Sequence, residues 1–122
     1  MPVEFSVEAD GTMTAAGPIY GAYGSSIPLA FVSVSIDGTK QSGTSNVKTA
    51  YNKATKRYEI TINGVNFNRL QHTAIATMSG WNGKPLFINT DDAPGGKLLV
   101  DLRDMNGNLG QADFQVVVFK TH

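Results

Sequence analysis

Apolar and polar residues alternate with a period of two along most of this chain. That period is typical of β-strands that bury one face, because successive strand side chains point to opposite sides of the sheet. The clearest run covers residues 57–62, in which Tyr58, Ile60 and Ile62 are expected to face inward. No window of helical length repeats apolar residues at i, i+3 and i+4. The sequence therefore predicts an all-β protein.

The same alternation predicts further strands over residues 3–7, 32–36, 47–51, 72–78, 86–89, 98–103 and 112–120. Glycine, proline and asparagine separate them, and an Asn106-Gly107 pair suggests a primed hairpin turn between the last two strands. Seven or eight short strands of this kind favour an antiparallel β-sandwich or jelly-roll-like fold in a single domain. We expect an N-terminal strand and a Gly/Pro/Ser-rich arm over residues 1–29, followed by the sandwich over residues 30–122.

The last predicted strand, ADFQVVVFK (residues 112–120), carries apolar side chains on both faces. Three of its residues point one way and can fill the core, while Val117 and Phe119 point the other way. Exposed apolar surface of this kind usually marks an association site. Other long strands present polar residues outward, so we expect this strand alone to carry apolar surface that another part of the protein or a second copy must cover. Val117 and Phe119 are therefore candidate oligomer-interface residues.

Length, charge and composition exclude several classes of function. The chain has 122 residues, ten basic and ten acidic side chains and no cysteine. No basic stripe suggests a nucleic-acid partner, and no apolar run reaches the roughly 20 residues that span a bilayer. The N-terminus lacks the basic and apolar regions of an export signal. We therefore expect no nucleic acid, no membrane insertion and no disulfide framework.

No constellation of residues indicates an enzyme. The two histidines, His72 and His122, lack the spacing of a metal pair, and no serine lies in a G-x-S-x-G elbow. Glu59 is expected on an exposed strand face without a cleft, and no glycine-rich loop opens a helix to hold phosphate. We predict that the protein is not an enzyme and has no cofactor. A hydrolase that uses His72 is a distant third possibility, behind two binding functions.

Two groups of carboxylates could take part in calcium binding, because calcium prefers oxygen ligands. They are Asp91 with Asp92, and Asp101 with Asp104. The run that begins at Asp104 resembles a calcium loop, but Leu109 occupies the position where such a loop needs glycine. Turn formation explains the Asp and Asn residues more simply, so no metal ligand is predicted. The sequence leaves open whether calcium binds at either pair.

Aromatic residues in predicted loops are candidate ligand-binding residues. Trp81, the only tryptophan, precedes Asn82 in a glycine-flanked loop, and Tyr20 and Tyr23 lie in the Gly/Pro/Ser-rich arm. An exposed ring flanked by polar amides can stack on a sugar. The alternative is that these rings cap the sandwich or lie in a subunit interface, where Tyr and Trp are also enriched.

Taken together, the DGT turn at residues 37–39, RYEITING at residues 57–64 and the closing segment from Asp104 to Phe114 resemble one group of proteins. These are the C-terminal head, or receptor-binding, domains of phage tail fibres and similar bacterial surface proteins. The resemblance covers roughly residues 30–120. It implies a homotrimer, a cell-surface ligand such as a glycan, and a location outside the cell or on a virion. The alternative is a monomeric or dimeric lectin-like sandwich whose N-terminal arm covers the second face of the last strand.

Overall fold

The computed structural model describes residues 27–80 and 83–121 in full, together with the backbone of four short strands nearer the N-terminus. Those four are β1 (Phe5–Val7), β2 (Met13–Ala15), β3 (Tyr20–Gly21) and β4 (Gly24–Ser25). The other nine are β5 (Ala30–Val34), β6 (Lys40–Gly43), β7 (Val47–Asn52), β8 (Arg57–Ile62), β9 (His72–Met78), β10 (Phe87–Asp92), β11 (Leu98–Arg103), β12 (Leu109–Gly110) and β13 (Phe114–Lys120). In these described ranges, no helix is long and apolar enough to cross a membrane.

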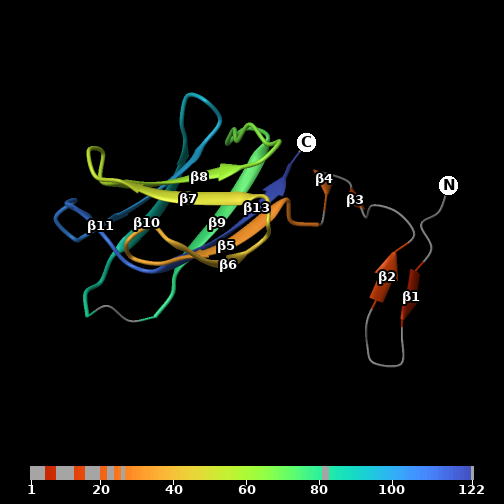
Figure 1. Cartoon of the computed structure of the whole chain (residues 1–122), viewed down its shortest axis with the longest axis horizontal. Coiled ribbons are helices and arrows are strands. Elements are labelled where there is room, and N and C mark those ends of the chain that lie inside the picture. The colour runs from red at the N-terminus through yellow and green to blue at the C-terminus, as the bar shows by residue number, and fades with distance from the viewer. Residues whose placement is uncertain are drawn as a thin grey trace.

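Nine strands form two antiparallel sheets that pack face to face (Figure 1). One sheet has the order β6-β5-β13-β9 and is called the β13 sheet below. The other has the order β10-β11-β8-β7, with the short β12 paired to one end of β11, and is called the β11 sheet. The predicted all-β sandwich is therefore confirmed.

The core lies between the two sheets and is built from the inward positions of alternating strands. Tyr58, Ile60 and Ile62 of β8 are almost completely buried, as the alternation predicts. Among the described residues, no polar or charged residue other than tyrosine is buried. The core residues are Ala30, Val32, Val34, Val47, Tyr58, Ile60, Ile62, Phe67, Leu98, Val100, Leu102, Ala112, Phe114, Val116 and Val118.

Tyr58 shows how the core accommodates its one phenol. Its ring makes an edge-to-face contact with the ring of Phe114, which belongs to the opposite sheet, and the centroids lie 4.8 Å apart. The hydroxyl donates a hydrogen bond to the carbonyl oxygen of Ile36 at 2.6 Å, so the buried oxygen keeps a partner. Burial raises the pKa of Tyr58, because a phenolate would lose its hydration there.

Strand boundaries differ from the predictions at several places. β5 covers Ala30–Val34, where a strand over residues 32–36 was predicted, so Ile36 lies outside the strand and is 49% exposed. β6, of sequence KQSG, was not predicted, and β10 continues to Asp92, beyond the predicted end of that strand at residue 89. Neither segment has the apolar alternation of a strand. Each is paired to a better strand, β6 to β5 and β10 to the whole length of β11, and that pairing overrides the weak local preference.

The predicted turn at Asn106-Gly107 is also corrected. A primed turn needs positive φ at both central residues, whereas only Gly107 has it in this loop. The carboxylate of Asp104 instead accepts the backbone N–H groups of Asn106 and Asn108, each at 2.9 Å. These bonds lower the pKa of Asp104. The turn leads from β11 into β12 of the same sheet, and the last strand, β13, belongs to the other sheet.

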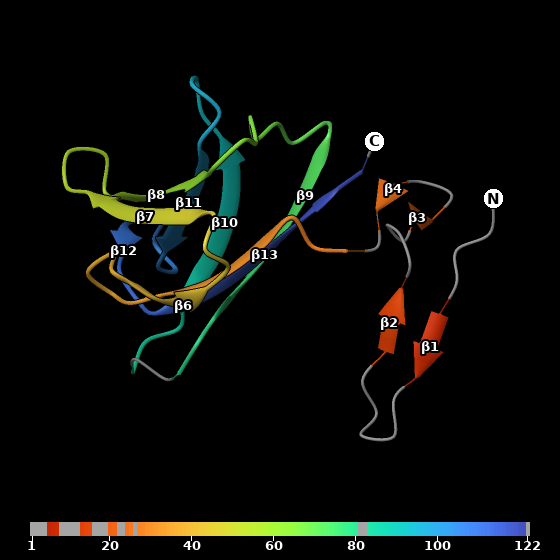
Figure 2. The ribbon, with the colours of Figure 1, turned by 45° about the vertical axis from the view of Figure 1, so that its right-hand side comes forward.

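The four N-terminal strands pair in two small hairpins. β1 pairs with β2 and β3 pairs with β4, and neither pair joins the two main sheets. The β3–β4 ladder, two residues long, lies within the stretch that was expected to form a Gly/Pro/Ser-rich arm. Figures 1 and 2 both show the β1–β2 hairpin to one side of the sandwich, beyond the end of β13.

Candidate functional site

The outer face of the β13 sheet carries a row of apolar side chains that crosses three strands. Val117 at the centre of β13 lies opposite Phe31 of β5 on one side and Ile75 of β9 on the other. Phe31 and Ile75 are each 54% exposed, and Val117 is partly exposed. Directly opposed residues on one face of a sheet have Cβ atoms about 5 Å apart, so the three side chains form one strip. We call Phe31, Val117 and Ile75 the apolar row.

Uncharged polar side chains border the apolar row. At the next outward position of β13, Gln115 lies opposite Ser33 of β5 and Thr77 of β9. A shallow hollow of about 180 Å³ lies between this polar row and the apolar row, and no charged side chain lines it. On the other side of the apolar row, the partly exposed Phe119 lies opposite Thr73. The face thus has an apolar centre and an uncharged polar margin.

Gly43 allows β6 to approach the backbone beneath the apolar row. It has a φ of +140°, and a Cβ added there would lie 2.3 Å from the carbonyl oxygen of Phe31. The same oxygen accepts the backbone N–H of Thr44 at 2.9 Å. A side chain at position 43 would therefore displace the strand that carries Phe31.

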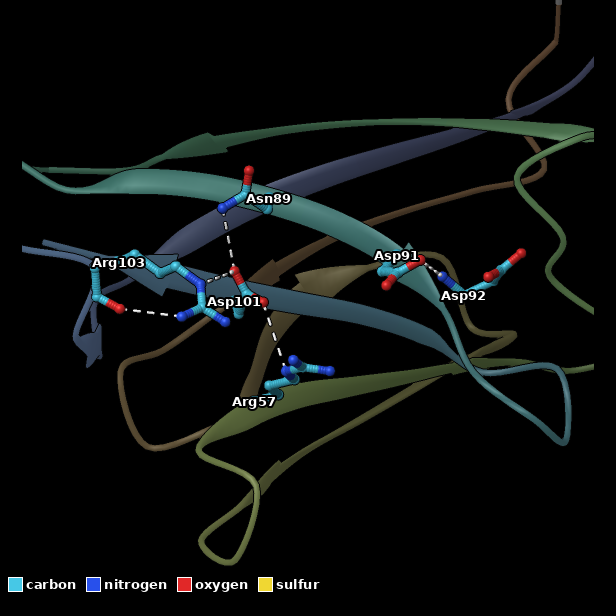
Figure 3. Close-up of polar contacts among 7 residues, drawn as sticks. Arg57, Asn89, Asp91, Asp92, Asp101 and Arg103 are labelled. Carbon is cyan, nitrogen blue, oxygen red and sulfur yellow. Dashed lines mark hydrogen bonds and ion pairs between the residues drawn. The ribbon is translucent and has the colours of Figure 1, made fainter.

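The outer face of the β11 sheet is charged (Figure 3). The carboxylate of Asp101 lies between two arginines, 3.5 Å from Nε of Arg57 and 3.7 Å from Nε of Arg103. It also accepts a hydrogen bond from the Asn89 amide at 3.2 Å. Arg103 in turn donates to the carbonyl oxygen of Gly107 at 3.0 Å. These contacts join β8, β10 and β11 across one face.

A second polar group on the same face is centred on Glu59. Its carboxylate accepts hydrogen bonds from the Asn52 amide at 3.0 Å and from the Lys97 ammonium at 3.1 Å. The Asn52 amide, followed by Lys97, lowers the pKa of Glu59 because both donors stabilise the charged form. The charged side chains on this face are therefore arranged in pairs and networks. The apolar row of the β13 sheet and its polar neighbours carry no charge.

A polar hollow of about 240 Å³ lies at the end of the β7–β8 ladder. It is lined by Ser45, Asn46, Lys48, Thr61 and Asn63. The Asn46 amide donates to the carbonyl oxygen of Leu29 at 3.1 Å, and the backbone N–H of Asn63 donates to the carbonyl oxygen of Asn46 at 2.7 Å. Within the described part of the chain, the side-chain oxygen of Asn46 is buried and accepts no hydrogen bond.

The structure describes some of the site residues that were predicted from the sequence, and others lie outside its described ranges. Val117 and Phe119 lie on the outward side of β13, while their role in an interface stays a prediction. Trp81, Asn82 and Tyr23 lie outside the described residues, and for Tyr20 only the backbone in β3 is described. The predicted glycan contacts therefore stay predictions.

His72 makes its contacts within the domain. Its Nδ1 lies 3.1 Å from the backbone nitrogen of Asn68, and its ring stacks on Phe67 with centroids 5.6 Å apart. Phe67 belongs to the core, so these contacts suit a structural histidine. His122 lies outside the described residues.

The acidic pairs considered for calcium contact other protein groups. Asp92 accepts the backbone N–H of Arg69 at 3.1 Å, and the Arg69 guanidinium lies 3.6 Å from Asp91. Asp101 and Asp104 make the contacts given above. Across residues 27–80 and 83–121, no group of three or more His, Asp or Glu residues is assembled that could hold a metal ion.

Phe31 and Ile75 were missed as site residues by sequence reasoning. The prediction confined exposed apolar surface to the last strand, whereas the register extends it to both neighbouring strands. A signal was present, because Phe31 is out of phase with Val32 and Val34 in AFVSV and must point outward if they point inward. What the sequence did not provide was the strand order that brings the three residues into one row.

Comparisons with protein-family models, with curated proteins and with solved structures each found no match. The resemblance to fibre-head domains therefore stays a prediction from the sequence. Function is inferred below from the geometry of the two outer faces.

Proposed function

We propose that this chain is a non-enzymatic assembling and binding module, a homotrimeric fibre-head or adhesin-type domain that recognises a cell-surface ligand such as a glycan. In this proposal the copies associate through the outer face of the β13 sheet. The observation that carries it is the apolar row of Phe31, Val117 and Ile75, which crosses three strands on an exposed face. An apolar centre with a polar margin is the usual anatomy of a protein interface.

The contrast between the faces supports the choice of surface. Side chains on the β11 sheet are engaged in ion pairs and hydrogen bonds, which burial in an interface would have to preserve or replace. The apolar row has no such groups to desolvate. Removing apolar area from water contributes about 25 cal/mol per Å², which would offset part of the entropy that association costs.

The mass of the full chain in solution tests the proposal. Sedimentation or light scattering at micromolar concentration is expected to give the mass of three chains. Val117→Glu and Phe119→Glu should each reduce it to one chain, because a carboxylate cannot be buried there unpaired. Thr61→Glu is the matched control, at an exposed position on the β11 sheet opposite Lys48, and should leave the mass unchanged. A single-chain mass for the unaltered protein would contradict the proposal.

The second candidate function is a monomeric or dimeric carbohydrate-binding sandwich. The observation that favours it is the polar hollow lined by Ser45, Asn46, Lys48, Thr61 and Asn63, since amides, hydroxyls and an ammonium can bond sugar hydroxyls. Titration with a broad set of glycans, followed by calorimetry so that a variant without Trp81 can be measured in the same way, tests both candidates. Asn63→Ala should weaken binding if the hollow is the site, whereas Trp81→Ala should do so if the loop is. No binding to any glycan would leave the assembly function without a sugar ligand.

A further inference from the structure

The net charge of the sandwich is concentrated in the hairpin of β7 and β8. Residues 47–62 contain four basic side chains and one acidic one, which gives a net charge of +3. The rest of residues 27–122 contains six basic and six acidic side chains, which cancel. The chain as a whole is also neutral. A polyanion is therefore attracted to this hairpin and not to the protein as a whole.

Three lysines of the hairpin have no carboxylate partner. Lys48, Lys53 and Lys56 are exposed, and across residues 27–80 and 83–121 none of them makes an ion pair. The ion pairs described above engage the other two charged residues of the hairpin, Arg57 and Glu59. We call Lys48, Lys53 and Lys56 the cationic strip.

The turn between β7 and β8 holds one lysine in an unfavourable backbone conformation. Lys56 has a φ of +58° and is, within the described part of the chain, the only residue other than glycine with a positive φ. The carbonyl oxygen of Asn52 accepts its backbone N–H at 2.7 Å, and the side-chain oxygen of Asn52 accepts that of Ala54 at 2.9 Å. Glycine would adopt this conformation without strain. A charged side chain kept where glycine would be more stable is typical of a functional position.

The cationic strip leads from this turn to the polar hollow. Lys48 lines the hollow and lies five residues before Lys53, so the two are about 17 Å apart along an extended chain. Ala50 and Asn52 occupy the outward positions of β7 between them, and the methyl group of Ala50 leaves the path open. The β7–β8 turn projects from the end of its sheet in both views (Figures 1 and 2). The strip therefore suits a short stretch of a linear polymer.

The polar hollow at the other end of the hairpin carries hydroxyl and amide groups on a fixed backbone. The ammonium group of Lys40 donates to the carbonyl oxygens of Thr44 at 2.7 Å and of Val47 at 3.3 Å, on either side of the residues that line it. Groups that are held in place before binding lose less entropy when a ligand arrives. The hollow can thus bond sugar hydroxyls beside the cationic strip.

We propose that the cationic strip and the polar hollow bind a linear acidic polysaccharide, with its anionic groups on the lysines and its hydroxyls in the hollow. This rests on the glycan recognition proposed above, and not on the assembly, and it names the chemical class of the glycan. Nucleic acid fits this surface less well. The two aromatic rings of the hairpin, Tyr51 and Tyr58, lie on its inward side and offer no platform on which a base could stack.

Calorimetry of the full chain tests the proposal. The acidic probes are polygalacturonate, alginate and dextran sulfate, and the neutral counterparts are the methyl ester of polygalacturonate and dextran. We expect at least one acidic probe to bind, with an affinity that falls as salt is raised, and its neutral counterpart not to bind. The absence of binding to all three acidic probes at low salt would overturn the proposal.

A charge-matched pair of variants locates the site. Replacing all three lysines of the cationic strip by glutamine should weaken binding about tenfold, because each exposed ion pair contributes little. The control Arg69→Gln/Lys84→Gln/Lys120→Gln removes the same charge from exposed positions elsewhere on the sandwich and should leave the affinity nearly unchanged. Equal losses in the two triple variants would show attraction without a site and would overturn the proposal.

Two single variants separate binding from stability and charge from hydrogen bonding. Lys56→Gly should raise the temperature of thermal unfolding, because it relieves the positive φ, and should weaken binding. A Lys56→Gly chain that binds as tightly as the unaltered protein would overturn the role of this lysine. Asn63→Ala should weaken binding without changing its salt dependence, because the amide carries no charge. Unchanged affinity in that variant would overturn the part of the hollow.

The remaining outcomes decide separate questions. Equal affinity for acidic and neutral probes would keep the glycan recognition and overturn the acidic class. Single-stranded DNA that binds as tightly as the best acidic probe, and through the same lysines, would assign the strip to nucleic acid and overturn the polysaccharide. The mass of the chain in solution tests the assembly independently, because the cationic strip belongs to the hairpin of β7 and β8 and not to the β13 sheet.

Discussion

The two outer faces of this sandwich differ in chemistry, although the face of the β11 sheet also carries one exposed aromatic ring, Phe87, opposite Arg103. On the β11 sheet, Asp101 is held by Arg57 and Arg103, and Glu59 by Lys97 and Asn52. On the β13 sheet, the central row is Phe31, Val117 and Ile75, and its polar neighbours carry no charge. Alternation alone fixes which side chains point outward on both sheets. The identity of those side chains decides whether the face meets water or another surface.

The largest effect is expected from a pair of phenylalanines on the two sides of the β13 sheet. Phe114 is completely buried against Tyr58, whereas Phe31 is 54% exposed. Phe114→Ala should lower the free energy of unfolding by about 3 to 5 kcal/mol, because it leaves a cavity in the core. Phe31→Ala should change the unfolding of an isolated chain by less than about 1 kcal/mol and reduce the assembled mass. Urea unfolding and sedimentation measure the two quantities.

Equal losses of stability in these two variants would remove the distinction between an inner and an outer face. A Phe31→Ala chain that keeps the full assembled mass would contradict the association surface. Phe31→Leu serves as the control, because it preserves most of the apolar area and should keep the mass.

A smaller effect is expected from the charged face. Asp101→Ala leaves Arg57 and Arg103 without their shared carboxylate and should lower the free energy of unfolding by about 1 kcal/mol, since both guanidinium groups are partly solvated. Asp101→Asn keeps the shape and an acceptor for Asn89, so its loss should be smaller. Neither change should alter the assembled mass, and a reduced mass would move the association surface to the β11 sheet.

The smallest effect is expected on acidification. Hydrogen bonds from the Ser35 hydroxyl and then from the Thr39 backbone lower the pKa of Asp37 from 3.8 to about 2, and the pKa values of Glu59 and Asp104 are also lowered. A carboxylate with a lowered folded-state pKa stabilises the fold above its unfolded pKa, and that contribution is lost as pH falls through the folded pKa. Thermal unfolding should therefore shift to lower temperature between about pH 4 and pH 2.

Asp37→Asn should reduce that acid dependence. None of the three carboxylates belongs to the apolar row, so association of chains that remain folded should not follow the same titration. An assembled mass that falls over this pH range before unfolding begins would mean that carboxylates take part in the interface.

Much of the sandwich could be predicted from the sequence because its best strands carry their own pattern. The strands β7 and β8, the bounds of β9 and β11, and the inward side of β13 were all predicted from alternation, and the structure confirms them. β6 and β12 could not be predicted, because β6 is polar, β12 is only two residues long, and both are strands only through pairing with β5 and β11. Their strand character is a property of the assembled sheet.

The candidate site was predictable only in part. The outward side of β13, with Val117, followed from one strand read alone. Phe31 and Ile75 join it through the order β5-β13-β9, in which Val117 pairs with residues 86 and 42 positions earlier in the chain, and such pairing has no local signature. A row that crosses a sheet is a property of register, and register is set by tertiary pairing.

The place of β13 in its sheet has a consequence for the synthesis of the protein. Although β13 follows every other strand along the chain, it lies between β5 and β9, so these two strands have no contact in the sheet without it. A ribosome that has not yet released residues 114–120 holds a chain in which the inner sides of β5 and β9 cannot be closed over the core. The sandwich can therefore close only after β13 has been synthesised, and β5 must stay out of wrong pairings until then.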